Sequence, residues 1–249
     1  MTNLFTFNKK RKSLFLAFFI FFSLDVYPQN FGCGTIADSN QIEYMSRDLA
    51  DRQNWDQPES VRLFPIKNHV VRRSDGSGGL NQADITEIMK ILNDYYINAN
   101  IQFYECGSIN FIDNSAFFDF NQSSESSLCS QNDVYNVINI YYFNSIISNS
   151  GGGLCGYTRF PPSSDRVFMS NSCTPKFGNP STIVHEIGHY FSLYHTHGKS
   201  NCGTTDELVN GSNCSRAGDD ICDTPADPNL RWNSNNNDCG PSWVNSNCI

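Results

Sequence analysis

The stretch His185-Glu186-Ile187-Gly188-His189, HEIGH in one-letter code, decides how the rest of the chain is interpreted. Residues four apart on a helix lie on one face, so His185 and His189 can hold the same metal ion. Glu186 is offset by one residue and can reach a water at the metal without binding the metal itself. His195 follows, which gives the spacing H-x3-H-x5-H. Three neutral imidazoles leave a fourth zinc position open, as in a catalytic zinc site.

The flanking residues favour a helix that starts near Ser181, with Ser181 or Thr182 as its N-terminal cap. Apolar residues at helical spacing predict a core-facing stripe made of Ile183, Val184, Ile187 and Phe191. An exposed helix with two surface histidines is the alternative. The chain has five histidines in total, and three of them fall in this frame, which favours the metal site.

Upstream of this helix, strand and helix patterns alternate. A run rich in β-branched residues predicts a strand over 61–72 with a break at Pro65, and apolar residues three or four apart predict a helix over 81–98. A shorter helix is expected over 41–51. Further strands are expected over 101–104, 134–143, 151–162 and 166–169. We expect 134–143 to be central and 151–162 to be an edge strand. The order is that of a mixed α+β domain.

The N-terminal 29 residues have the pattern of a secretory signal. The basic run 9–12 precedes an unbroken apolar run over 14–22, which is shorter than the roughly 18 to 20 residues that span a bilayer. A buried N-terminal helix is the alternative. The ten cysteines include no C-x-x-C pair, so disulfides in an oxidising compartment are the simpler interpretation. We therefore expect a secreted protein without a stable membrane span once the signal is removed.

The charge balance limits the partners. The chain has 17 basic and 25 acidic residues, and beyond residue 29 the balance is 13 to 24. A body this acidic argues against nucleic acid as a partner, because nucleic-acid binding requires basic patches. The balance suits a soluble protein that holds calcium.

The segment from His185 to His195 resembles the zinc signature H-E-x-x-H-x-x-G-x-x-H of the metzincin metallopeptidases. Its continuation HEIGHYFSLYHTH, followed by GDDICDTPAD over 218–227, is similar to the pappalysin-like branch and especially to its cytophagalysin-type members. The resemblance implies a metzincin-like catalytic domain, with a mixed twisted sheet, a backing helix and an active-site helix. It also implies Zn2+ as cofactor, a protein or peptide substrate, and a substrate-binding edge strand, here at Gly156, Tyr157 and Thr158.

Two further sites follow from this resemblance. Calcium is expected in the acidic region after the zinc motif, where Asp220, Asp223 and Thr224 lie in the matching stretch; a solvated acidic loop is the alternative. Cys33, in the sequence Cys-Gly-Thr, looks like the cysteine of a pro-segment that keeps such enzymes latent by binding the zinc. An ordinary disulfide from Cys33 is the alternative.

Two departures from the family pattern stand out. Ser192 replaces the glycine at which the helix breaks to bring the third histidine back, and a left-handed turn costs a non-glycine residue roughly 1 to 2 kcal/mol. No methionine follows Met169, although metzincins carry a methionine turn downstream of the third histidine. We therefore expect 1–29 to be a signal peptide, 30–60 a pro-segment or linker, and 61–249 a catalytic domain whose C-terminal part is incomplete.

The expected activity is hydrolysis of peptide bonds by a zinc-activated water, with Glu186 as the general base. Two other classes share these residues. One is a catalytically inactive binding or adhesion protein that retains the fold, and the other is a zinc hydrolase acting on a non-peptide amide. An intact Glu186 argues against the inactive protein.

Overall fold

The computed structural model describes residues 32–52, 60–163, 165–198 and 207–227. A nine-stranded sheet in the order β3-β2-β6-β9-β8-β7-β5 is its centre; β4 adds to β2, and β1 adds to β8. The strands are β1 Gly32–Cys33, β2 Arg62–Arg72, β3 Ile101–Glu105, β4 Asn110–Asp113, β5 Asp119–Asn121, β6 Ile138–Phe143, β7 Ser145–Ile147, β8 Gly153–Thr158 and β9 Arg166–Ser170. The α-helices are α1 Ser39–Arg52, α2 Gln82–Tyr96, α3 Glu125–Asn132 and α4 Ser181–Tyr190. Short 3-10 turns are Ile97–Ala99, Gln122–Ser124, Asn171–Cys173, Pro175–Phe177 and Cys214–Arg216.

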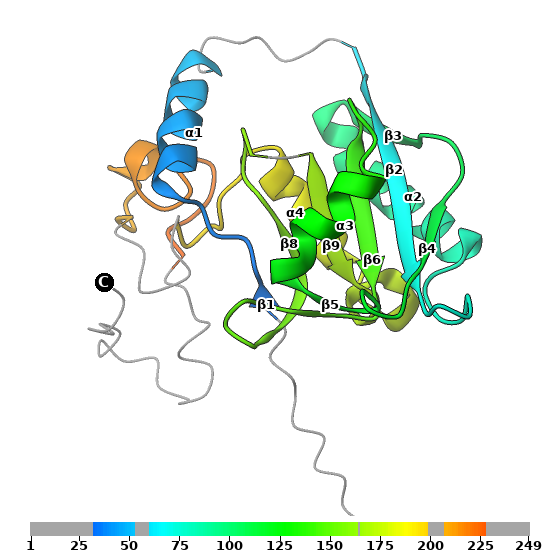
Figure 1. Cartoon of the computed structure of the whole chain (residues 1–249). Helices are drawn as coiled ribbons and strands as arrows, with labels where there is room; N and C mark the ends of the chain where they lie inside the picture. The colour runs from blue at the N-terminus through cyan, green and yellow to red at the C-terminus, as the bar shows by residue number, and fades with distance from the viewer. Residues whose placement is uncertain (1–31, 53–59, 164, 199–206, 228–249) are drawn as a thin grey trace, which may run out of the picture.

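Each face of the sheet carries its own hydrophobic core (Figure 1). Helices α2 and α4 pack on one face, where Ile85, Leu92 and Ile187 are fully or almost fully buried. Helix α3 packs on the other face over a stack of aromatic rings that includes Phe120 and Phe168. Burial on both faces explains why every residue of the central strand β6 is buried and why Asn139 is its one amide side chain among apolar and aromatic residues. The expected α+β architecture is confirmed.

Strand β2 runs without the break that we expected at Pro65. Its pairing with β6 begins only at Ile66, and the Ile66 carbonyl accepts from the Cys106 amide on the β3 side. Successive residues of a strand bond to opposite neighbours, so Pro65 faces the β6 side just before that ladder starts. The missing amide of proline therefore costs no hydrogen bond there.

Two expected strands differ in extent or in pairing. The central strand is β6, which starts at Ile138 rather than at residue 134, because the Asn139 side chain bonds Val134 and Val137 and holds the preceding residues in a loop. The segment expected as an edge strand, β8, is not an open edge in this chain. Gly153 and Leu154 pair with β7, and β1 pairs in parallel along the part of β8 up to Gly156. The edge is covered by residues from the segment before the domain.

Residues upstream of the domain lie against it. Helix α1 confirms the helix expected over 41–51. Disulfides join Cys155 of β8 to Cys173 and Cys214 to Cys222, which confirms the prediction of disulfides. Cys33, Cys106 and Cys129 are free thiols.

The helices of the described ranges are all too short or too polar to cross a bilayer. The signal predicted over 1–29 lies outside the described residues.

Candidate metal centre

Helix α4 carries His185, Glu186 and His189, and its apolar side is set by Ile183 and Ile187, which are completely buried. The expected cap at Ser181 or Thr182 is wrong. Asn179 takes that role instead: its Oδ1 accepts from the Thr182 amide at 3.3 Å and from the Ser181 hydroxyl at 3.2 Å. The N-cap position itself is Pro180, which has no polar side chain, so the preceding residue supplies the acceptor.

The helix ends in the sharp turn that the third histidine requires. Ser192 adopts a left-handed conformation with φ of 73°, and the Leu193 amide donates to the Gly188 carbonyl at 3.0 Å. Serine therefore takes the conformation that was expected of a glycine at this position. The chain reverses there and brings the ring of His195 to 4.6 Å from the ring of His189.

Four ligand atoms converge at this end of the helix. One atom each of Cys33, His185, His189 and His195 lies within 4.8 Å of the others. Nδ1 of His189 lies 2.7 Å from the Leu193 carbonyl oxygen, so this nitrogen carries the proton and donates, and Nε2 is left as an acceptor. Nε2 faces Nε2 of His185 at 3.0 Å and the Cys33 Sγ at 3.5 Å. The structure thus brings together the three predicted histidines and adds the predicted cysteine.

Burial favours the neutral imidazole at His185 and His189. Burial, with the nearby His185, lowers the pKa of His189 to about 4, and burial also lowers the pKa of His185. The Cys33 thiol moves in the other direction: burial and the Glu186 carboxylate raise its pKa well above the usual range. A thiolate at this position therefore requires a cation beside it, and neutral imidazoles are the form that binds one.

Glu186 is fully buried between helix α4 and strand β8. Its Oε2 accepts a 3.0 Å hydrogen bond from the Thr35 hydroxyl, while Oε1 has no hydrogen-bond partner. Burial raises the pKa of Glu186 to about 8, against the opposing effect of the Thr35 hydrogen bond. A Cβ on Gly156 would lie 2.9 Å from Cγ of Glu186, so glycine is needed for this close approach.

The sequence did not single out Thr35 or Phe160 as site residues. The ring of Phe160, which follows β8 by two residues, meets the ring of His189 edge-on at 5.1 Å. Thr35 belongs to the same Cys-Gly-Thr sequence as Cys33. That sequence was the signal from which a site role for Thr35 could have been predicted. Of the predicted edge-strand residues, Gly156 and Thr158 contact this site, whereas the Tyr157 hydroxyl donates to Glu125 at 3.2 Å on the other face.

The acidic residues after the zinc motif occupy a separate turn. The Thr224 hydroxyl donates to Asp219 Oδ2 at 2.9 Å, and Asp219 Oδ1 accepts from the Ile221 amide at 3.0 Å. Asp220 has φ of 65°. Within the described ranges, the group of convergent metal ligands is the one at the histidines. Calcium at Asp220, Asp223 and Thr224 stays a prediction.

Comparison with known proteins finds similarity over the region that contains the three histidines. Residues 82–196 match the family described as metallo-peptidase family M12B, reprolysin-like. An extracellular metalloprotease of Pyricularia oryzae is 28% identical over 172 residues, which cover 64% of this chain and 54% of that protein. Another from Neurospora crassa is 27% identical over 218 residues, 79% of this chain and 70% of that protein. The chain thus spans about half the length of the first of these relatives.

Two solved structures share the fold. The promirolysin variant of Tannerella forsythia superposes with a TM-score of 0.55 at 20% identity, over 79% of this chain and 76% of that one. Mature mirolysin of the same organism, in complex with a cleaved peptide, gives 0.50 at 20% identity, over 69% and 74%. The comparisons confirm the predicted mixed-sheet fold, which is like that of mirolysin, and they show that residues 82–196 are similar to a metallopeptidase family.

Proposed function

We propose that this chain is a secreted zinc-dependent endopeptidase of the pappalysin-like type. In this proposal His185, His189 and His195 hold the zinc and Glu186 is the general base. The observation that carries it is the convergence of four ligand atoms within 4.8 Å beside a fully buried glutamate. The relatives named extracellular metalloproteases and the two disulfides described above support secretion.

The residues present fit a zinc ion. Imidazole nitrogen and cysteine sulfur are ligands that zinc prefers. The hydrogen bond from His189 to the Leu193 carbonyl fixes the orientation of that imidazole, as backbone carbonyls do for histidines in zinc sites. When bound by three imidazoles, zinc polarises a carbonyl and brings the pKa of a coordinated water near 7. The Cys33 sulfur lies in the same cluster and accounts for a fourth ligand in the latent chain.

Glu186 is placed to handle the proton of the reaction. Its carboxylate lies beside the histidine cluster, within reach of a water at the metal, which is the position that a general base requires. Glu186 would accept the proton of the attacking water and then donate it to the leaving amine. The β8 backbone at Gly156 lies directly against this glutamate, so a peptide paired along β8 would present its carbonyl beside it.

The segment before the domain blocks this arrangement. Strand β1 occupies the β8 edge that a substrate would use, and the Cys33 Sγ lies 3.5 Å from His189 Nε2. We therefore assign Cys33 to a latency contact rather than to a disulfide. The thiol of Cys33 is free, which supports the latency contact over the disulfide. We also propose that oxygen atoms of Asp220, Asp223 and Thr224 would bind a calcium ion, next to the loop that the Cys214–Cys222 disulfide closes.

The test measures metal content and hydrolysis together. The full chain and its Cys33→Ala/Thr35→Val variant are purified, their zinc is quantified, and both are assayed on a library of quenched peptides. About one zinc per chain with cleavage by the variant supports the proposal. Zinc without cleavage of any peptide indicates an inactive binding protein, and cleavage only of non-peptide amides indicates another hydrolase. A chain without zinc would overturn the proposed site.

A further inference from the structure

The segment that covers the site makes contacts with the catalytic domain beyond the Cys33 sulfur. The Gly34 amide donates to the Gly156 carbonyl at 2.9 Å, in continuation of the β1–β8 pairing. A Cβ on Gly34 would lie 2.6 Å from Cδ1 of Leu154 and 3.1 Å from Cβ of Tyr157, so a larger residue would have to displace the Leu154 side chain. None of these atoms is a metal ligand, so these contacts do not depend on an ion.

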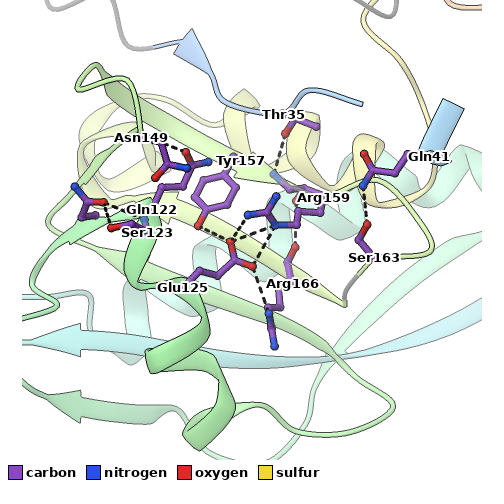
Figure 2. Close-up of polar contacts among 12 residues, drawn as sticks. Thr35, Gln41, Gln122, Ser123, Glu125, Asn149, Tyr157, Arg159, Ser163 and Arg166 are labelled. Atoms are coloured by element: carbon purple, nitrogen blue, oxygen red, sulfur yellow. Dashed lines mark hydrogen bonds and ion pairs between the residues drawn. The ribbon is translucent and has the colours of Figure 1, made fainter. Parts of the chain in front are cut away.

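Thr35 is the first of two side chains that anchor the segment. Its hydroxyl accepts from the Thr158 amide at 2.8 Å and donates to Glu186 Oε2 at 3.0 Å (Figure 2 shows the bond to the backbone of β8). The Thr35 side chain is 2% exposed. One hydroxyl therefore bonds both to the strand that would pair with a substrate and to the glutamate that would act as base. A buried hydrogen bond is costly to break when its groups are left without another partner.

Gln41 is the second anchor, at the start of α1. Its Nε2 donates to the Phe160 carbonyl at 2.9 Å and to the Ser163 hydroxyl at 2.7 Å; Figure 2 shows Gln41 and Ser163 facing each other. Its Oε1 accepts from the Asp38 amide while Asp38 accepts from the Gln41 amide, each at 2.9 Å, as in a capping box. The capping bonds fix the amide group, so it is already aimed at the loop that follows β8. Phe160 in turn lies on His189.

We propose that the covering segment, residues 33–45, is held over the site mainly by contacts that are independent of the metal, with Thr35 and Gln41 as its two anchors. The Cys33 sulfur adds to this hold and is not required for it. This inference rests on the proposed function, because it concerns how the same site is kept closed. Latency then has two separable parts: occupation of the metal by Cys33, and occupation of the base and the strand edge by Thr35.

Amide hydrogen exchange in the full chain tests the proposal without relying on catalysis. The reporters are the Gly34 amide, bonded to β8, and the Thr158 amide, bonded to Thr35. Exchange is measured with zinc and with a chelator, and the intact mass verifies that the segment is still attached. Removing zinc should leave both amides protected within about threefold. Thr35→Val should speed exchange at Gly34, and Gln41→Ala should speed it at both amides, each by about tenfold or more, with or without zinc.

Matched variants separate anchoring from general damage. Thr35→Ser retains the hydroxyl and should retain protection of Gly34, and Glu43→Gln, which alters an exposed residue of α1, should change nothing. The amides of Ile140 and Tyr142 in β6 should exchange at wild-type rates if the fold is intact. If zinc removal alone speeds Gly34 and Thr158 as much as the two anchor variants do, the metal contact holds the segment and the proposal is wrong. It is equally wrong if both anchor variants retain protection. Failure of the proposed function would show instead as missing zinc or missing hydrolysis.

Discussion

The hydroxyl of Thr35 donates a 3.0 Å hydrogen bond to the carboxylate of Glu186, although 151 residues separate the two along the chain. Both side chains are almost completely buried. The covering segment therefore bonds to the predicted base directly, in addition to covering the site. In the proposed function, this bond must be released before Glu186 can accept a proton from water.

Replacing Cys33 with alanine should raise peptide hydrolysis by the full chain only modestly, by about threefold, because Thr35 and Gln41 still hold the covering segment over the site. Zinc content should stay the same, since the three histidines remain. The measurement is the initial rate on a quenched peptide. Cys106→Ala, which removes a free thiol elsewhere, is the matched control and should leave the rate unchanged. A disulfide to Cys33 in the purified latent protein would contradict the prediction.

Replacing Ser192 with glycine should stabilise the protein by about 1 kcal/mol, because φ of 73° strains serine and not glycine. Thermal unfolding of the zinc-loaded protein measures the change as a rise in Tm. Ser127→Gly is the control: it places glycine inside helix α3 at an exposed position and should destabilise by about 0.5 to 1 kcal/mol. Equal shifts for the two variants would show that the turn at Ser192 carries no strain.

Glu125 joins helix α3 to the strands behind the site. Its carboxylate accepts from Arg159 at 2.9 Å, Arg166 at 3.3 Å and the Tyr157 hydroxyl at 3.2 Å (Figure 2). Glu125→Gln should lower the free energy of unfolding by about 2 kcal/mol, since it leaves two arginines without their shared carboxylate. Urea unfolding measures this. Asp94→Asn, in an exposed pair with Lys90, should cost no more than about 0.5 kcal/mol, and a similar loss in both variants would contradict the assignment.

His69 predicts how stability depends on pH. Burial lowers its pKa from 6.5 to about 4, while its ring bonds Asn139 and Asn110, each at 3.0 Å. The unfolded chain binds the proton first, so stability is complete above pH 6.5 and is lost as the pH falls from 6.5 toward 4. The slope from this group is about 1.4 kcal/mol per pH unit. NMR titration of the His69 ring measures its pKa directly; a value near 6.5 would contradict the prediction.

The sequence predicted well what depends on short-range pattern. The spacing of His185 and His189 predicted that these side chains lie together, because four residues return a helix to the same face, and the structure brings His195 to them. The apolar stripe at Ile183 and Ile187 likewise predicted which side of that helix is buried. The left-handed turn at Ser192 followed from the position of His195, which the chain can reach only by reversing there.

What the sequence did not predict depends on contacts between distant segments. The Thr35–Glu186 bond and the Gln41–Phe160 bond exist only because β1 pairs with β8, and no local pattern specifies that pairing. Whether Pro65 breaks the strand also depends on a distant segment. Its missing amide would cost a hydrogen bond only if β6 paired with β2 at that residue, and the pairing begins at Ile66. The cap at Asn179 was missed because the path by which a loop enters a helix determines which side chain reaches the free amides.

The most direct test of the account is Glu186→Gln in the Cys33→Ala/Thr35→Val variant. Zinc content and peptide hydrolysis are measured on the same samples. The account predicts that zinc stays at about one per chain while hydrolysis falls by at least about a hundredfold, because glutamine retains the shape of the side chain and cannot accept the proton. Hydrolysis within a few-fold of the parent variant, with zinc still bound, would contradict the role of Glu186 as the base.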